Sequence, residues 1–335
     1  MRSPALPILA AATLLATTAY GDVFLPEGEA GSVLHLADDL SEIGRIEGVE
    51  NPHGLAVAPS RGILVIGSLA EAEADDMEAP EGVSEADHDA HHGGSGGTGV
   101  ASIVTLVGMT DHAVAARIAV PGMVHHVEVD ADERWAVVTH PGQGGVSLID
   151  LDEESVRGPI ATGPNPEYAV WSPDEEAFVV SNAGNATLSV VDPERGIVTR
   201  NLALDDGPKH LDRARDGMIA AALADVGAVA LVAPDGAVER IEVGGELHGV
   251  QVARDAIWVA AKARDVVVRL DRATGERIEA SPGPEPYHIA LAADGLLVSS
   301  AAGSDLWRLD PDTLETVQRI SAEATIHQIR VADPG

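Results

Sequence analysis

The chain has 335 residues, with 54 acidic side chains against 21 Lys or Arg, and a formal net charge of −33. It contains no cysteine, which excludes disulfides, thiolate metal sites, iron–sulfur clusters and haem attachment through CxxCH. So negative a charge disfavours nucleic acids and anionic membrane surfaces as partners and favours cations.

The N-terminus has the pattern of an export signal. A basic start, Met1-Arg2, precedes an apolar run over residues 5–16, and small residues follow. The run is shorter than the roughly 20 apolar residues that a membrane span requires. We therefore predict a signal peptide over residues 1–19. The mature protein, residues 20–335, is then expected to be periplasmic or secreted, monomeric and not inserted in a membrane.

After three short apolar strands, a unit of about 40 residues repeats along the chain. Each unit has two short strands around a tight turn and then an alternating apolar strand that ends in Asp, as in residues 188–192, 267–271 and 306–310. A further turn leads to a fourth strand. Four short antiparallel strands separated by Gly, Asp and Pro turns are typical of a β-propeller blade.

Seven innermost strands can be counted from the residues that begin them, which are His53, His125, Tyr168, His210, His248, His288 and His327. The last, residues 326–331, has no strands after it, whereas strands at 22–25, 32–36 and 42–46 precede the first. We predict an all-β, seven-bladed β-propeller in which N- and C-terminal strands share one composite blade. This closure would hide the sheet edges.

The repeat resembles that of the YVTN-type β-propellers, named for a Tyr-Val-Thr-Asn strand end followed by a Val-Ser-Val-Ile-Asp strand. The best matches are residues 180–182 (Val-Ser-Asn) with 189–192 (Ser-Val-Val-Asp), and 138–140 (Val-Thr-His) with 147–150 (Ser-Leu-Ile-Asp). The resemblance covers the mature chain and implies the fold. It says little about function, because propellers host many unrelated activities.

One segment, residues 69–99, breaks the repeat between the second and third strands of the first full blade. An acidic stretch from Glu71 to Asp76 leads to His88, His91 and His92, which are flanked by Asp and followed by glycines. A polar segment without periodicity is expected to form a disordered loop. Its histidines and carboxylates are typical of a metal-capturing tract, and the alternative is an acidic insertion whose histidines are incidental.

Histidines also begin six of the seven innermost strands. These strands line the channel of a propeller, so the side chains should converge near one mouth. Neutral imidazole is a common ligand of zinc and also suits copper and nickel. The alternative is that they fill a polar channel and bond to water or backbone. The predicted channel ligands are His53, His125, His126, His210, His248, His288 and His327.

Position relative to the following turn divides these histidines into two groups. His53, His125 and His248 lie seven positions before the turn residue, whereas the others lie six before it. Adjacent strand residues face opposite ways, so the two groups need not face the same site. We therefore expect the first three to be the strongest candidates for one shared metal site. Glu246 and Glu285 could complete its ligand shell or orient a ligand. Outside the ring, His140 is a second-rank candidate ligand. We expect His35 and His112 to be structural or surface residues.

The topology of a four-stranded blade places the His-bearing loop and the start of the innermost strands on one face. Tethering a second ligand set over the channel raises its local concentration. This arrangement resembles the AztD-type periplasmic zinc metallochaperones, propellers that carry zinc to the binding protein of a zinc ABC transporter. The resemblance implies Zn²⁺ as the cargo, with Cu²⁺ as the alternative, and a periplasmic solute-binding protein of a metal ABC transporter as the partner.

Other functions stay open at this point. A channel metal could activate water in a lactonase-like hydrolase, a ring histidine could be an axial haem ligand, or the top face could be a plain protein-interaction scaffold. There is no nucleophile motif and no consistent acid–base pair, so we expect a protein that is not an enzyme. Since ligands must lose their protons to bind, zinc affinity is expected to fall below about pH 6.

Overall fold

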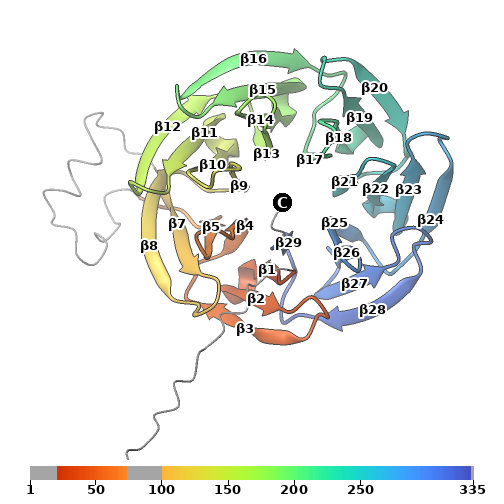
Figure 1. Cartoon of the computed structure of the whole chain (residues 1–335), viewed down its shortest axis with the longest axis horizontal. Coiled ribbons are helices and arrows are strands. Elements are labelled where there is room, and N and C mark those ends of the chain that lie inside the picture. Colours follow the sequence, from red (N-terminus) through yellow and green to blue (C-terminus); the bar gives the residue numbers. More distant parts are fainter. Residues whose placement is uncertain (1–20, 74–99, 333–335) are drawn as a thin grey trace, which may run out of the picture.

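The computed structural model describes residues 21–73 and 100–332. Seven sheets stand around a central channel as the blades of a β-propeller (Figure 1). The predicted signal peptide and the histidines of the predicted loop, His88, His91 and His92, lie outside the described residues. In the described part of the chain, no helix has the length and apolar character needed to cross a membrane.

Blades are numbered here by their innermost strands, beginning with β4. Blade one contains β4 (Pro52–Ala58), β5 (Ile63–Ser68), β6 (Ala72–Glu73), β7 (Val100–Gly108) and β8 (Val114–Pro121). Blade two contains β9 (Val127–Val129), β10 (Trp135–His140), β11 (Gly145–Asp150) and β12 (Ser155–Ala161). Blade three contains β13 (Pro166–Ser172), β14 (Ala177–Asn182), β15 (Thr187–Asp192) and β16 (Ile197–Ala203).

The second half of the ring repeats this plan. Blade four contains β17 (His210–Arg213), β18 (Ile219–Leu223), β19 (Ala228–Val232) and β20 (Val238–Glu242). Blade five contains β21 (Val250–Val252), β22 (Ala256–Ala261), β23 (Val266–Asp271) and β24 (Arg277–Ala280). Blade six contains β25 (Pro286–Ala292), β26 (Gly295–Ser300), β27 (Asp305–Leu309) and β28 (Thr316–Ser321).

Blade seven confirms the predicted composite closure. It joins β29 (Arg330–Val331) at the C-terminal end to β1 (Val23–Glu27), β2 (Ser32–Leu36) and β3 (Glu42–Glu47). Strand β29 pairs antiparallel with β1 through Val23↔Val331 and Phe24↔Arg330. It is shorter than the predicted 326–331, although a single bridge between Glu27 and Ile326 extends the contact.

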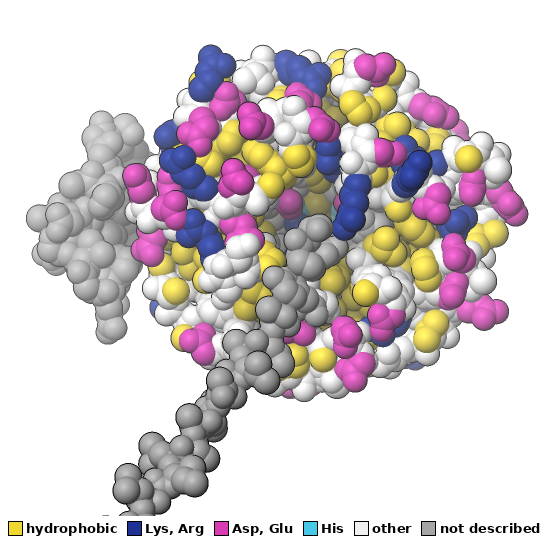
Figure 2. Space-filling model, viewed as in Figure 1, with side chains coloured by type: hydrophobic (Ala, Val, Ile, Leu, Met, Phe, Trp, Pro, Cys, Tyr) yellow, Lys and Arg dark blue, Asp and Glu magenta, His cyan; other side chains and the backbone are white. Residues whose placement is uncertain are grey.

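The packing explains why the repeat is so apolar at its centre. Middle strands such as β10, β11 and β14 are buried at every position because neighbouring blades cover both faces of the sheet. Outer strands such as β12 and β16 are largely exposed. Charged side chains of both signs are spread over the face seen in Figure 2.

Connections from the second to the third strand lie at the same end of the blades as the starts of the innermost strands. Five of them contain a 3₁₀ turn, namely η1 (Gly28–Ala30), η3 (Pro141–Gln143), η4 (Ala183–Asn185), η5 (Ala224–Val226) and η6 (Lys262–Arg264). In blade one this connection runs from β5, which ends at Ser68, to β7, which begins at Val100. The predicted insertion therefore arises on the face of the disk where the channel histidines begin.

Candidate metal centre

Two successive residues at the start of each innermost segment form an upper and a lower level of the channel. At the lower level, the backbone N–H groups of His126, Tyr168 and His288 donate to hydroxyls on the second strands of their blades, over 3.0, 2.9 and 3.2 Å. His210 and Gly249 take the corresponding places in blades four and five. The residues just before these five are the upper level, and they include His125 and His248.

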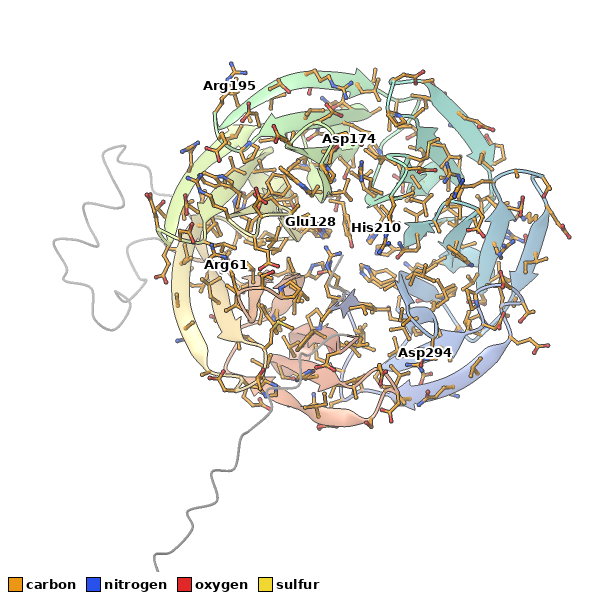
Figure 3. The ribbon with its side chains drawn as sticks, in the orientation of Figure 1. Arg61, Glu128, Asp174, Arg195, His210 and Asp294 are labelled. Atoms are coloured by element: carbon orange, nitrogen blue, oxygen red, sulfur yellow. The ribbon has the colours of Figure 1, made fainter. Side chains whose placement is uncertain are left out.

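Three channel histidines come together. One ring nitrogen from each of His210, His248 and His288 lies within 4.8 Å of those of the other two. Their ring centroids are 4.6 to 4.9 Å apart. They come from three consecutive blades, and Figure 3 shows His210 beside the central channel. We call these three residues the histidine triad.

Gly249 explains how an upper-level histidine reaches two lower-level ones. The glycine leaves the lower level of blade five without a side chain, between His210 of blade four and His288 of blade six. Its backbone packs directly on blade six, because its N–H donates to the carbonyl of Tyr287 over 2.8 Å. A Cβ at this position would lie 2.6 Å from that carbonyl oxygen, so only glycine fits. His248 stacks on the Tyr287 ring at 3.6 Å and completes the triad.

Burial keeps the triad neutral near pH 7. It lowers the pKa of each imidazole well below the ordinary 6.5, chiefly by desolvation, and the neighbouring histidines lower the pKa further. A neutral imidazole presents a lone pair on one nitrogen, which is the form that binds a metal ion. The three side chains therefore need to release few protons when a cation arrives.

Two triad nitrogens are left without partners. The Nε2 atoms of His210 and His288 are buried and make no hydrogen bond within the described residues. A buried polar atom without a partner costs about 1–3 kcal/mol, so native proteins seldom keep one without a reason. A bound ion would satisfy both atoms.

The triad fits a tetrahedral cation in size. Zinc binds histidine nitrogen at about 2.0–2.1 Å, which puts tetrahedral donors about 3.3–3.4 Å apart. Nitrogens within 4.8 Å of one another need to close by at most about 1.5 Å to hold such an ion. No carboxylate of the described residues belongs to the group, so a tetrahedral ion held by these three imidazoles would keep its fourth position for water or an incoming ligand.

A second group of histidines lies at the mouth with similar distances between rings, but its ring nitrogens do not form a close group of three within the described residues. The rings of His53 and His125 are 4.7 Å apart, and those of His53 and His327 are 5.0 Å apart. The Nδ1 atoms of His53 and His125 lie 2.8 and 3.0 Å from backbone carbonyl oxygens of His125 and Glu167. Burial lowers the pKa of His53 to about 3. The structure thus groups His248 with His210 and His288, and not with His53 and His125 as the position count suggested.

His126 lies in the channel wall outside both groups. It stacks on Tyr168 at 3.4 Å, and its Nε2 and Nδ1 lie 3.1 and 3.3 Å from Ala169 O and Gln328 Nε2. Both of its nitrogens therefore have protein partners. We therefore assign His126 to the channel wall and not to the metal centre.

The remaining candidates lie apart from the triad. Glu246 is exposed and lies 3.5 Å from the Lys262 ammonium, and the close group contains neither it nor Glu285. His140 is fully buried, with its Nε2 2.9 Å from the Ser147 hydroxyl. In blade three the equivalent pair is an asparagine and a serine, which indicates a structural role.

Comparison with known proteins supports the fold. No protein-family model and no curated sequence matches the chain. Among solved structures, the periplasmic gluconolactonase PpgL of Pseudomonas aeruginosa is similar with a TM-score of 0.68 and 16% identity, over 93% of this chain and 99% of that one. Apo AztD of Citrobacter koseri is similar with a TM-score of 0.57 and 16% identity, over 92% and 96% of the two chains. Hydrazine synthase of Kuenenia stuttgartiensis is similar with a TM-score of 0.64 and 14% identity, over 92% of this chain and 94% of that one.

These similarities reach across the whole propeller at low identity. They show a seven-bladed propeller structurally like YVTN-type proteins, among them enzymes and a protein named AztD. The fold alone does not choose between these activities. The choice has to come from the channel residues of this chain.

Proposed function

We propose that the protein is a periplasmic zinc-binding propeller, a metallochaperone that holds Zn²⁺ in its channel and passes it to a transporter-associated solute-binding protein. The observation that carries the proposal is the histidine triad, with two buried Nε2 atoms that have no partner within the described residues. The resemblance to AztD-type proteins and the overall similarity to apo AztD support the same function.

The donor set favours zinc over the other common cations. Three neutral imidazoles suit Zn²⁺ and Cu²⁺, whereas Ca²⁺ and Mg²⁺ prefer oxygen ligands. The chain has no cysteine to hold Cu(I) as a thiolate. An open fourth position lets a ligand from another protein attack the ion before the channel histidines release it, which is how a carrier exchanges its cargo. The net charge of −33 concentrates cations around the molecule.

A competition titration tests this proposal. The demetallated mature protein is titrated with Zn²⁺ and Cu²⁺ against a chromophoric chelator, beside a variant that lacks residues 71–97. We expect one tight zinc site that persists without the predicted loop. The absence of binding tighter than micromolar in both proteins would refute the proposal. Loss of the zinc site in the variant without the loop would show that the site is not in the channel and would also contradict the proposal.

A second function has one observation in its favour. Three protein ligands with an open fourth position are also the arrangement of catalytic zinc, which activates a bound water. A lactonase-like hydrolase would use the triad in that way. Hydrolysis of simple lactones that appears with zinc and disappears with a chelator would favour the hydrolase. The absence of turnover by the zinc-loaded protein would favour the carrier function.

A further inference from the structure

A second polar site lies at the opposite ends of the innermost strands from the triad. A cavity of about 160 Å³ opens there between blades seven, one and two. Its walls combine five apolar residues with one ion pair, namely Ala56, Val57, Pro59, Val129, Val331, Glu128 and Arg330. Figure 3 shows Glu128 beside the central channel. The side chains of Arg330 and Glu128 are 24% and 23% exposed, so a small molecule in the cavity can reach the pair.

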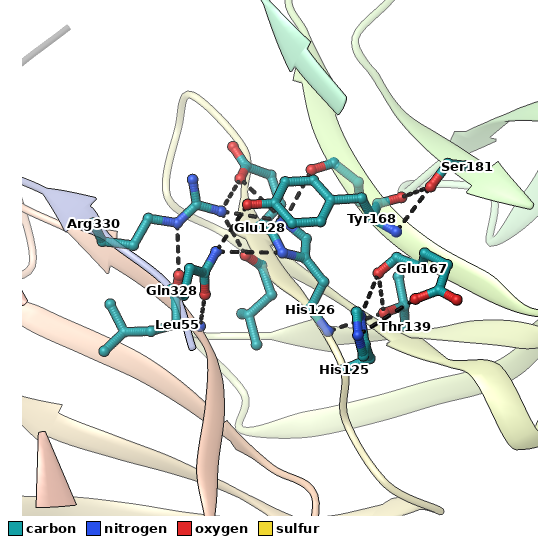
Figure 4. Close-up of polar contacts among 12 residues, drawn as sticks. Leu55, His125, His126, Glu128, Thr139, Glu167, Tyr168, Ser181, Gln328 and Arg330 are labelled. Atoms are coloured by element: carbon teal, nitrogen blue, oxygen red, sulfur yellow. Dashed lines mark hydrogen bonds and ion pairs between the residues drawn. The ribbon is translucent and has the colours of Figure 1, made fainter. Parts of the chain in front are cut away.

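The guanidinium of Arg330 is held firmly on one side only (Figure 4). Its Nε donates to the Leu55 carbonyl over 2.7 Å, and its Nη2 donates to Val127 O over 3.2 Å and to Glu128 Oε2 over 3.0 Å. The same Nη2 lies 3.2 Å from His126 Nε2. Within residues 21–73 and 100–332, Nη1 has no hydrogen-bond partner. Two charge-bearing N–H groups are therefore available to a ligand.

The cavity sets the size of that ligand. A cavity of about 150 Å³ admits a molecule of the size of benzene, which has six heavy atoms. Arginine is suited to carboxylates because its planar fork gives charge-assisted hydrogen bonds. We propose that this cavity binds a small monocarboxylate of at most about six heavy atoms. Its carboxylate accepts hydrogen bonds from Nη1 of Arg330, and its short carbon chain packs against Val57 and Val331.

Nearby carboxylates define what the site excludes. Glu128 already neutralises Arg330, and Asp212 accepts hydrogen bonds from Gln251 Nε2 and Val252 N, both over 2.6 Å. Repulsion from these two carboxylates grows with the charge of the ligand, so a ligand with two or three negative charges is disfavoured more strongly than a single carboxylate. The site therefore favours single carboxylates over polyanions and holds them weakly.

The site is separate from the triad and does not depend on metal binding. No residue in the cavity wall belongs to the triad, and the stacked pair His126 and Tyr168 stands between Arg330 and His210. Urea unfolding therefore serves as a measure of folding that depends on neither site. A failure of the carboxylate proposal and a failure of the zinc proposal give different results.

The test is saturation-transfer NMR and a chemical-shift titration of the demetallated mature protein. Acetate, propionate and lactate are the probes, glycerol is a neutral control and citrate is a polyanionic control. We expect saturable binding of the three monocarboxylates and none of the two controls. Equal binding of glycerol, or no saturable binding of any monocarboxylate, would overturn the proposal.

Two variants locate the binding. Val57→Phe fills the cavity without removing a hydrogen bond, and Arg330→Lys removes the fork while keeping the charge. We expect each to weaken propionate binding at least about tenfold, the factor for one charge-assisted hydrogen bond. Because Arg330→Lys also loses contacts to Leu55 and Val127, the folded state of each variant is checked by its urea unfolding midpoint. Unchanged propionate affinity in Val57→Phe would overturn the proposal even if Arg330→Lys does not fold.

Discussion

Replacing one triad histidine with an apolar side chain of similar size should separate metal binding from stability. In His288→Leu, the buried Nε2 that has no partner is removed, and with it a cost of about 1–3 kcal/mol in the apoprotein. Shape changes in the core offset part of this gain, by about 1 kcal/mol. We therefore expect the free energy of unfolding of the apoprotein to stay equal or to rise slightly.

Zinc affinity should change in the opposite direction. Four-ligand structural zinc sites bind with about 10–16 kcal/mol, so one ligand contributes about 3–4 kcal/mol, which is a factor of several hundred in affinity. The assay pairs chelator competition with urea unfolding in the presence and absence of zinc. The matched control is His327→Leu, a mouth histidine outside the triad. Destabilised apoprotein with unchanged zinc affinity in His288→Leu would refute the reasoning and make the triad structural.

Four further predictions follow from the packing and the buried charges. Because burial lowers the pKa of all three triad histidines, zinc binding should persist below pH 6, lower than expected from unperturbed imidazole; half-loss at or above pH 6.5 in competition titrations would contradict this. The same shifts mean that the unfolded chain binds more protons below pH 6.5, so apoprotein stability should fall with pH there, as measured by urea midpoints from pH 7 to 5. Gly249→Ala places a Cβ 2.6 Å from Tyr287 O and should weaken zinc binding by displacing blade five from blade six, whereas Gly142→Ala, with open space around it and no positive φ, should not. Phe24→Ala should destabilise the composite blade by about 3–5 kcal/mol, since its ring is fully buried; a loss under 1 kcal/mol in urea unfolding would show that the closure is not important for stability.

The architecture could be predicted from the sequence because it is periodic. Each blade repeats the same order of apolar runs and turns, and the C-terminal strand has no successor to pair with. The unpaired strand β29 therefore had to meet β1, as the structure confirms. Convergence of the histidines followed from their common place at the start of the innermost strands.

Membership of the triad could not be predicted in the same way. It depends on the level at which each histidine lies, and turns of different length hide that level in a count along the chain. Gly249 was the available signal, since a glycine directly after His248 leaves space for that ring. The Arg330–Glu128 pair was missed because its two residues are 202 positions apart in the sequence and no local pattern marks it.

Anomalous scattering at the zinc edge from a crystal of the zinc-loaded mature protein tests the central claim most directly. We predict one strong peak in the channel, about 2.0–2.1 Å from a nitrogen of each of His210, His248 and His288. A peak held by other residues, or no peak in the channel of fully loaded protein, would contradict the account.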